Sequence, residues 1–466
     1  MPRSIWPPAQ WAQATFEAAE LGDQRRTQRL IQMASRLAEH PGGTLPQAFT
    51  AWAELKGAYR FLSNAELTQA QLQQPHWEQT RADCRQAGTY LLIEDTMDLD
   101  YSHSPAAEDL GFIGDGHGRG IRVHTTLALR IEGWSAQQQP ETVVVGLAGQ
   151  QCYWPNLAPE NESRGQRLRR TRQSQRWTQE IAAMGRPPAG CQWIYVADQE
   201  SDFYEPIDCC QRQGVDFVIR SYQDRSLEEN PAHLRQVMAQ APLRGLMWIH
   251  LRARPGQAAR TATATVRAQS VRLTGPWRPG GWRPAFTLNV VEVKEVNPPP
   301  EIEQPLHWVL LTSLPCLTWT EVQRVVGCYT ARWLIEEYHK TVQSGTQVEQ
   351  SQLKRGYRLD NLIAILALVA VRLLSTKLLA RAWPEKAVPL EEFGQEARIL
   401  LSALFGPPEG GWTYYSLFIA VARLGGFVAR KGDGMPGWQT IWRGWERLMQ
   451  MCRALEVLKY PPKGYG

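Results

Sequence analysis

Two aspartates close short apolar runs, where a charged side chain needs an explanation. Asp95 follows the run 89–94, and Asp198 follows the similar run 192–197. Each run has the length and composition of a buried strand, and an ionised carboxylate there is costly unless it meets a cation. Strand ends in open α/β sheets are also where ligands gather. The alternative for each Asp taken alone is a turn-initiating or helix-capping residue.

A third acid lies in a segment with helical spacing of polar groups. Tyr329, Arg332, Glu336, Lys340 and Gln343 fall on one face of a predicted long helix that begins near residue 318 and continues past residue 340. Arg can fork onto a phosphate and Tyr can hydrogen-bond one, so this face could hold a metal and grip phosphates. An exposed helix with ordinary charge pairs explains the same spacing.

Three carboxylates that meet in space would form a hard-oxygen site suited to Mg²⁺, with Mn²⁺ as a substitute. Beside a helix face that grips phosphates, such a site could carry out phosphoryl transfer with two metal ions, one activating a water and the other stabilising the leaving oxygen. This scheme needs no covalent intermediate. Tyr329 could also be a recombinase nucleophile, but it is interpreted as a phosphate-binding residue because its partners on the helix face fit phosphate binding.

The elements predicted around these acids are those of an α/β protein. Further strands are expected at 123–131 and 142–147, and a polar, Arg-rich helix at 165–184. Strands followed by helices favour a core whose sheet is partly buried on both faces. From about 217 to 312 the sequence is β-rich, with strict alternation at 261–266. This stretch is interpreted as an insertion in the α/β domain.

The first segment reads as a small helical module that ends at a linker near residues 73–78. Arg25, Arg26 and Arg29 share one side of its second helix. Such a side is either an ordinary solvated face or a phosphate-contacting surface at a helix N-terminus. The Arg-rich runs 164–176 and 252–272 leave the same two alternatives open.

The last eighty or so residues are expected to be helical, from about residue 382. Trp438, Trp442 and Trp445 have helical spacing there and indicate a core or a dimer face. The apolar stretch 362–371 is shorter than a bilayer requires and ends at Arg372, so a buried helix is expected.

Composition limits which classes of protein are possible but does not select one of them. A chain of 466 residues with 43% hydrophobic and 21% charged residues is an ordinary globular protein of two or three domains. The net charge of +5 permits a nucleic-acid partner without demonstrating one. Eight scattered cysteines without a CxxC pair indicate buried thiols in a reducing cytoplasm. The N-terminus has no apolar run of signal-peptide type, and no membrane association is expected.

Many segments resemble the bacterial cut-and-paste transposases of the IS-four type, which are Tn-five-like and carry a Y-R-E-K signature. The matching segments occur in the family's order along almost the whole chain. They lie at 21–30, 57–61, 93–97, 196–202, 217–221, 297–299, 308–313, 329–340 and 422–427. One such match would be weak, but many in the right order are specific.

The resemblance selects among neighbouring acids. It implies that Asp95, Asp198 and Glu336 are the catalytic metal ligands, rather than adjacent carboxylates such as Glu94 and Glu337. It also implies a set of DNA-binding residues, with Trp308 stacking on a flipped base and Arg220 beside a hairpin. That set is Arg25, Arg26, Arg29, Arg60, Arg220, Trp308, Tyr329, Arg332, Trp333 and Lys340. The family's last signature lysine falls at Gln343 here, and Lys340 could reach the same phosphate.

The fold that the resemblance implies is α/β, an RNase H-like catalytic core with a β-rich insertion plus small all-α N-terminal and C-terminal domains. The expected domains are an end-binding domain (1–72), a catalytic domain (73–381, with the insertion at about 215–313) and a dimerisation domain (382–466).

The implied activity is excision of a transposable element at its inverted-repeat ends through a DNA hairpin, followed by strand transfer to target DNA. The implied partners are double-stranded DNA and a second copy of the chain in a synaptic complex, in a nucleoid-associated, cytoplasmic protein. Two alternatives stay open. One is a metal-dependent nuclease that does not join strands, and the other is an inactive or domesticated transposase-derived DNA-binding protein.

Overall fold

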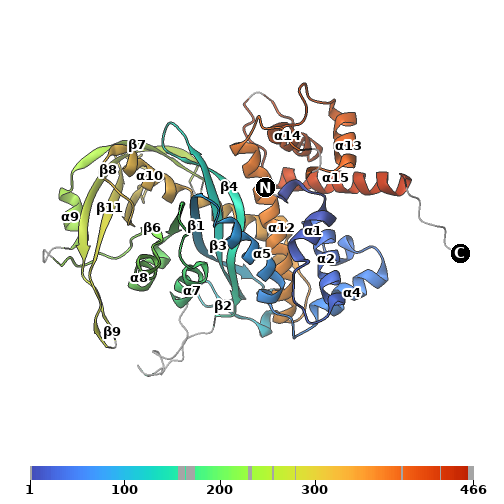
Figure 1. Cartoon of the computed structure of the whole chain (residues 1–466), viewed down its shortest axis with the longest axis horizontal. Coiled ribbons are helices and arrows are strands. Elements are labelled where there is room, and N and C mark those ends of the chain that lie inside the picture. The colour runs from blue at the N-terminus through green and yellow to red at the C-terminus, as the bar shows by residue number, and fades with distance from the viewer. Residues whose placement is uncertain are drawn as a thin grey trace.

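Strands lie on one side of the protein and most helices on the other (Figure 1). This is a computed structural model, and it describes residues 3–155, 163, 174–228, 233–253, 257–278, 280–389, 392–430 and 432–459. The protein is a mixed α/β structure with a helical N-terminal region and one large mixed sheet. Residues 164–173, part of the predicted Arg-rich helix and DNA surface, lie outside the described residues.

The large sheet has the strand order β2-β3-β1-β5-β6-β12-β11-β8-β7, with β4 also paired to β3. β1 runs parallel to β5, and β5 runs parallel to β6, whereas the other pairs are antiparallel. The strands are β1 (Gly88–Asp100), β2 (Gly111–Ile113), β3 (Gly118–Trp134), β4 (Pro140–Tyr153), β5 (Cys191–Ala197), β6 (Asp216–Arg220), β7 (Leu243–Leu251), β8 (Arg260–Leu273), β11 (Phe286–Glu295) and β12 (His307–Thr312). β9 (Trp277–Arg278) and β10 (Gly281–Trp282) form a separate two-stranded ribbon.

The helices divide between the two ends of the chain and the faces of the sheet. They are α1 (Pro8–Phe16), α2 (Gln24–Glu39), α3 (Leu45–Ala48), α4 (Trp52–Leu62), α5 (Gln69–Asp83), α7 (Ser174–Met184), α8 (Tyr204–Gln213), α9 (Leu234–Gln240), α10 (Trp319–Thr330), α11 (Trp333–Lys340), α12 (Gly356–Ala382), α13 (Gln395–Phe405), α14 (Tyr414–Leu424) and α15 (Trp438–Lys459). Short 3₁₀ or π turns are η1 (Arg3–Ile5), η2 (Ala107–Asp109), η3 (Gln199–Ser201), η4 (Thr341–Gly345) and η5 (Val348–Gln350).

The centre of the sheet is buried on both faces, as its apolar runs predict. Side chains alternate along β1: Leu91 and Ile93 belong to the core cluster that includes α12, whereas Tyr90 and Leu92 belong to the cluster that includes α7 and α8. The stretch predicted to be β-rich, about 217 to 312, contains β6 as well as β7 to β12, and its long strands continue this same sheet through the β12–β6 pair. The alternation predicted at 261–266 is present in the burial pattern of β8.

α12 is the central helix of the protein. It is long and apolar enough to span a membrane by length and composition, but 94% of its most apolar window is buried inside the protein. A helix that is apolar on all sides is expected in such a core. The prediction of a buried helix at 362–371 is confirmed, and the helix extends well beyond that stretch at both ends.

The linker predicted near residues 73–78 is wrong, because these residues form the middle of α5. Thr68 and Gln71 make a capping box at its start. Gln73 is fully buried, and its Nε2 donates to Gln150 Oε1 and to the Ala364 carbonyl, both at 2.9 Å. The predicted boundary at residue 72 therefore falls inside a helix. The boundary at residue 381 falls at the end of α12.

The C-terminal helices are present as predicted, and their tryptophans are buried within the same chain. Trp438 and Trp442 stack with their ring centroids 5.8 Å apart. Trp445 Nε1 donates to the Ala38 carbonyl of α2 at 3.2 Å. This stripe is thus core packing. Dimerisation through the C-terminal helices stays a prediction.

Candidate active site

Asp95 and Asp198 are neighbours across two parallel strands. The register pairs Glu94 of β1 with Ala197 of β5, so the two aspartates occupy the next position on each chain. Asp198 lies just after β5, and its Oδ1 accepts from Glu200 N at 2.8 Å, which makes it the N-cap of η3. The helix-capping alternative therefore describes its local structure. Asp95 is not at a strand end, because β1 continues to Asp100.

Glu336 lies in α11, and the continuous helix predicted through this region is wrong. α10 ends at Thr330 and α11 starts at Trp333. Between them a tight turn forms, in which Arg332 N donates to the Tyr329 carbonyl at 3.1 Å. Ala331 and Arg332 keep right-handed helical angles, so the break between the two helices lies within a helical conformation.

Arg332 connects two of the three acids. Its Nη1 donates to Asp95 Oδ2 at 3.0 Å and its Nη2 donates to Glu336 Oε1 at 2.5 Å. Burial raises the pKa of Asp95 to about 7; Arg332 opposes this rise, whereas Asp198 and Glu336 add to it. Burial alone would lower the pKa of Arg332, but Asp95, Tyr329 and Glu336 raise it above its ordinary value. Asp198 and Glu336 are therefore both close enough to Asp95 to interact with its carboxylate electrostatically.

Asp95, Asp198 and Glu336 have the chemistry of a divalent-metal site, although in this structure Arg332 pairs with Asp95 and Glu336. Within the described ranges, no three Asp, Glu, His or Cys side chains lie close enough to share a metal ion. Three carboxylates around a nearly buried position are hard oxygen donors of the kind that Mg²⁺ binds. Their mutual repulsion is opposed here by one guanidinium, which stands where a cation is needed.

Tyr329 and Arg220 lie beside this centre. Tyr329 is 3% exposed, and burial raises the pKa of its hydroxyl, whereas the positive charges of Arg332 and Arg220 oppose that rise. Arg220 is half-buried at the end of β6, with Nη2 3.5 Å from the His307 carbonyl. The predicted Tyr and two predicted Arg residues are thus brought together with the acids.

Trp308 packs inside the core rather than at a surface. It is 4% exposed, and its ring meets Tyr329 edge-on with centroids 5.0 Å apart. This packing matches a buried strand aromatic, so stacking of Trp308 on a base stays a prediction that requires the ring to move.

The remaining residues of the signature helix have different surroundings. The Arg332 guanidinium lies 5.6 Å from the centre of the half-buried Trp333 ring, and Lys340 is exposed. Gln343 Nε2 donates to the Asp98 carbonyl at 3.0 Å, which ties η4 to β1. The residue that departs from the family pattern therefore has a structural contact of its own.

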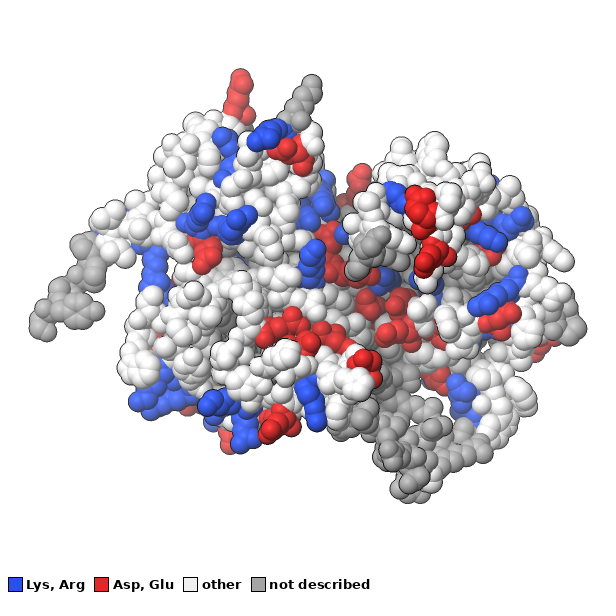
Figure 2. Space-filling view, turned by 180° about the vertical axis from the view of Figure 1, so that it is seen from behind, with Lys and Arg blue, Asp and Glu red and all other residues white. Residues whose placement is uncertain are grey.

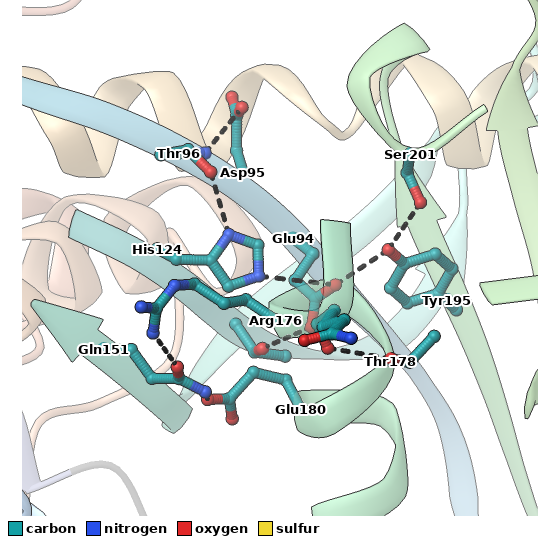
Figure 3. A network of polar contacts seen from close by, with 12 residues as sticks. Glu94, Asp95, Thr96, His124, Gln151, Arg176, Thr178, Glu180, Tyr195 and Ser201 are labelled. Carbon is teal, nitrogen blue, oxygen red and sulfur yellow. Dashed lines mark hydrogen bonds and ion pairs between the residues drawn. The ribbon is translucent and has the colours of Figure 1, made fainter. Parts of the chain in front are cut away.

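A buried polar network lies on the other face of β1, directly behind Asp95 (Figure 3). Glu94 is fully buried and accepts hydrogen bonds from Thr126 Oγ1 at 2.9 Å and from Tyr195 Oη at 2.7 Å. Thr96, whose N donates to Asp95 Oδ1 at 2.8 Å, also contacts His124 Nδ1 through its hydroxyl at 2.8 Å. Sequence reasoning did not find this network. Its signal was alternation, which puts residues 94 and 96 on the face opposite Asp95.

Charge is unevenly spread over the molecule. Acidic side chains gather across the middle of the face seen in Figure 2, and most Lys and Arg side chains of that face lie around them. A concentration of one charge attracts counter-ions to that part of the surface.

The predicted end-binding arginines lie on α2 and α4. Asp23 caps α2 through a 2.8 Å hydrogen bond from Arg25 N, and the Arg25 side chain is exposed. Arg26 pairs with Glu66 at 3.0 Å, and Arg29 Nη1 donates to Gln32 Oε1 at 2.6 Å. Arg60 is exposed in the last turn of α4. Arg25 and Arg60 are thus the most accessible of the four.

The N-terminal helices are similar to a known domain. Residues 8–67 match the family model described as Transposase DNA-binding, a range that covers α1 to α4. This match supports a transposase-type protein that binds DNA through its N-terminal helical region.

Proposed function

We propose that this chain is a DNA transposase of the IS-four type that cleaves the ends of a transposable element and joins them to target DNA. The observation that carries the proposal is the position of Arg332, whose charge interacts with three acids from distant elements, Asp95, Glu336 and Asp198. Asp95 and Asp198 are adjacent across β1 and β5, and Arg332 links Glu336 to Asp95.

The strand arrangement supports an RNase H-like core. Five strands lie in the order β4-β3-β1-β5-β6, with the first three antiparallel and the last two parallel to β1. The order along the chain, a three-stranded meander followed by strands that alternate with α7 and α8, is what such a core requires. Asp95 lies on the central strand of this order, β1, and Asp198 directly follows the adjacent strand, β5.

In the proposed reaction Asp95, Asp198 and Glu336 would hold Mg²⁺ or Mn²⁺. Such ions, when bound, lower the pKa of a water and stabilise a leaving 3′ oxygen. Arg332, Tyr329 and Arg220 would bind phosphate oxygens around the scissile bond, since Arg forks onto phosphates and Tyr donates to them. The hairpin intermediate and the synaptic dimer are part of the proposal because of the resemblance alone.

The test is an assay of cleavage and joining on a duplex that carries the element's own end. Asp95→Asn, Asp198→Asn and Glu336→Gln should each abolish Mg²⁺-dependent cleavage while end binding persists. Glu200→Gln, a neighbouring acid outside the proposed ligand set, is the matched control and should retain cleavage. Cutting that survives any of the three substitutions would defeat the assignment, and cleavage without joining would indicate a nuclease.

A second candidate is a transposase-derived DNA-binding protein without catalysis. The observation that favours it is Gln343, which replaces a family lysine and binds the β1 backbone instead. This candidate predicts that no Mg²⁺-dependent cleavage occurs with the natural chain, although the N-terminal domain binds DNA.

A further inference from the structure

Glu337, the residue after Glu336, is surrounded by three cationic side chains. Its Oε1 lies 2.5 Å from Arg252 Nη1 and 3.8 Å from Arg381 Nη1, and its Oε2 lies 3.0 Å from Lys377 Nζ. Arg252 follows β7 of the insertion, whereas Lys377 and Arg381 are one turn apart on α12. Three separate parts of the fold therefore meet at one carboxylate, which we call the Glu337 cluster.

The charges of the Glu337 cluster do not balance. One carboxylate faces three cations, which leaves two positive charges. Burial lowers the pKa of Lys377, and repulsion from Arg381 and Arg252 adds to that effect against the attraction of Glu337. Cations crowded in this way are held at a cost that an additional anion would relieve.

Exposure shows which of the cations an anion could reach. The side chains of Glu337 and Lys377 are each 8% exposed, so their pairing is internal. Lys377 Nζ also lies 4.1 Å from the centre of the Trp438 ring, which holds it in place. Arg252 and Arg381 are 46% and 39% exposed. Lys377 and Glu337 therefore neutralise each other inside the protein. The guanidinium groups of Arg252 and Arg381 lie beside this pair and are accessible to an anion.

We infer that Arg252 and Arg381 form a binding site for a backbone phosphate of DNA, and that Glu337 holds both in place when DNA is absent. The inference rests on the proposed function, because the Glu337 cluster contains the residue that follows Glu336 on α11. Guanidinium groups suit this ligand because each can donate two parallel hydrogen bonds to phosphate oxygens. Because Arg252 follows β7 of the insertion and Arg381 lies on α12, both parts of the fold would contact the same DNA at this site.

The experiment measures binding to duplex DNA in EDTA over a range of salt concentrations, so that no cleavage occurs. Removal of one phosphate contact should reduce the slope of log affinity against log salt by about 0.9. Because both guanidinium groups bind the same phosphate, we expect a reduction of about 0.9 for the double variant and a smaller reduction for Arg252→Gln and for Arg381→Gln alone. The control is Arg443→Gln, at an exposed residue of α15 whose Nε donates to the Gln439 carbonyl of the same helix, and it should leave the slope unchanged.

Two duplexes distinguish the sources of the phosphate. If the arginine variants bind only a duplex that carries the element's end more weakly, the phosphate belongs to the transposon end. If they also bind an unrelated duplex more weakly, the site accepts the backbone of any DNA. Unchanged slopes in both single variants, with unfolding temperatures like that of the natural chain, would overturn the inference. If the Glu337 cluster only stabilised the fold, the salt slopes of both single variants would stay unchanged.

The Glu337→Gln variant further distinguishes a phosphate-binding site from a cluster that only stabilises the fold. A phosphate site predicts retained or stronger DNA binding in this variant, because the competing carboxylate charge is gone, whereas weaker binding by a folded variant contradicts it. These measurements need no metal. Abolished cleavage in the Asp95→Asn variant with unchanged salt slopes in the arginine variants would therefore leave the proposed function standing and remove only this site.

Discussion

The Arg332 guanidinium donates to the Asp95 carboxylate with 3.0 Å between Nη1 and Oδ2, across 237 positions of sequence. The same group donates to Glu336, so one cation joins two of the three proposed metal ligands. A guanidinium and a divalent ion cannot both occupy the space between these carboxylates. Arg332 must therefore release at least one carboxylate before the acids can share a metal, and a DNA phosphate is a suitable alternative partner for it.

The first prediction concerns this competition. Arg332→Gln should bind Mn²⁺ more tightly than the natural chain in the absence of DNA, by about tenfold, because a charge-assisted hydrogen bond contributes about 1.5 kcal/mol or more. Cleavage should fall in the same variant, since the substitution removes the guanidinium that is proposed to bind a phosphate. Titration of Mn²⁺ by electron paramagnetic resonance measures the affinity. Arg324→Gln, on α10, is the control, and weaker Mn²⁺ binding by Arg332→Gln would contradict the prediction.

The second prediction concerns acid sensitivity. Burial lowers the pKa of His339 in α11 to about 3, and the positive charge of Arg332 adds to the effect. The unfolded chain therefore binds a proton at higher pH than the native chain, so His339 lowers stability as pH falls from about 6.5 towards about 3. Relative to His339→Phe, the natural chain should lose about 2 kcal/mol of unfolding free energy between pH 7.5 and pH 5.

Urea unfolding at the two pH values measures this difference, and the subtraction removes the contributions of the other titrating groups. His103→Phe, a substitution at an exposed position, should show no such difference from the natural chain. Equal pH dependence in the natural chain and His339→Phe would mean that His339 is accessible to protons in the native state.

The sheet and its buried strands were predictable because the information is local. Apolar runs and alternation mark β1, β3, β4, β5 and β8 directly in the sequence. The extension of β1 beyond Asp95 was missed because its polar residues look like a turn. Asp98 stays in the strand since it faces Arg122 of β3, with 2.6 Å between Oδ1 and Nε. Met97 and Leu99, both buried, were the available signal.

Contacts between distant segments could not be read from spacing. Helical periodicity gave the Arg332–Glu336 pair, but nothing in the spacing indicates that Arg332 turns towards Asp95 at a break between α10 and α11. The same holds for Gln73, whose partners Gln150 and Ala364 are remote in sequence. The linker predicted near residues 73–78 is wrong for this reason, because local polarity does not show that a side chain finds buried partners.

The third prediction concerns the network behind Asp95. Tyr195 Oη donates to Glu94 at 2.7 Å and lies 2.9 Å from Ser201 Oγ, at the end of η3. Tyr195→Phe leaves the buried Glu94 carboxylate with one donor fewer, and should lower the unfolding free energy by about 1–3 kcal/mol. Tyr222→Phe, at a tyrosine that is 69% exposed, is the control. Denaturant unfolding of both variants checks this, and equal stability would indicate that Glu94 is neutral or otherwise satisfied.

The fourth prediction concerns the N-terminal DNA-binding region. Arg25 lies in the first turn of α2, where backbone N–H groups and the helix dipole already favour an anion. A phosphate contact from its exposed side chain carries no sequence information, so Arg25→Gln should weaken binding to different duplexes alike and reduce the salt slope by about 0.9. Arg26→Gln should have a smaller effect because Glu66 already neutralises that side chain. Binding measured by fluorescence anisotropy at several salt concentrations decides between these outcomes. Weaker binding to one duplex sequence but not another would show that Arg25 reads bases, and a larger effect of Arg26→Gln would show that DNA displaces Glu66.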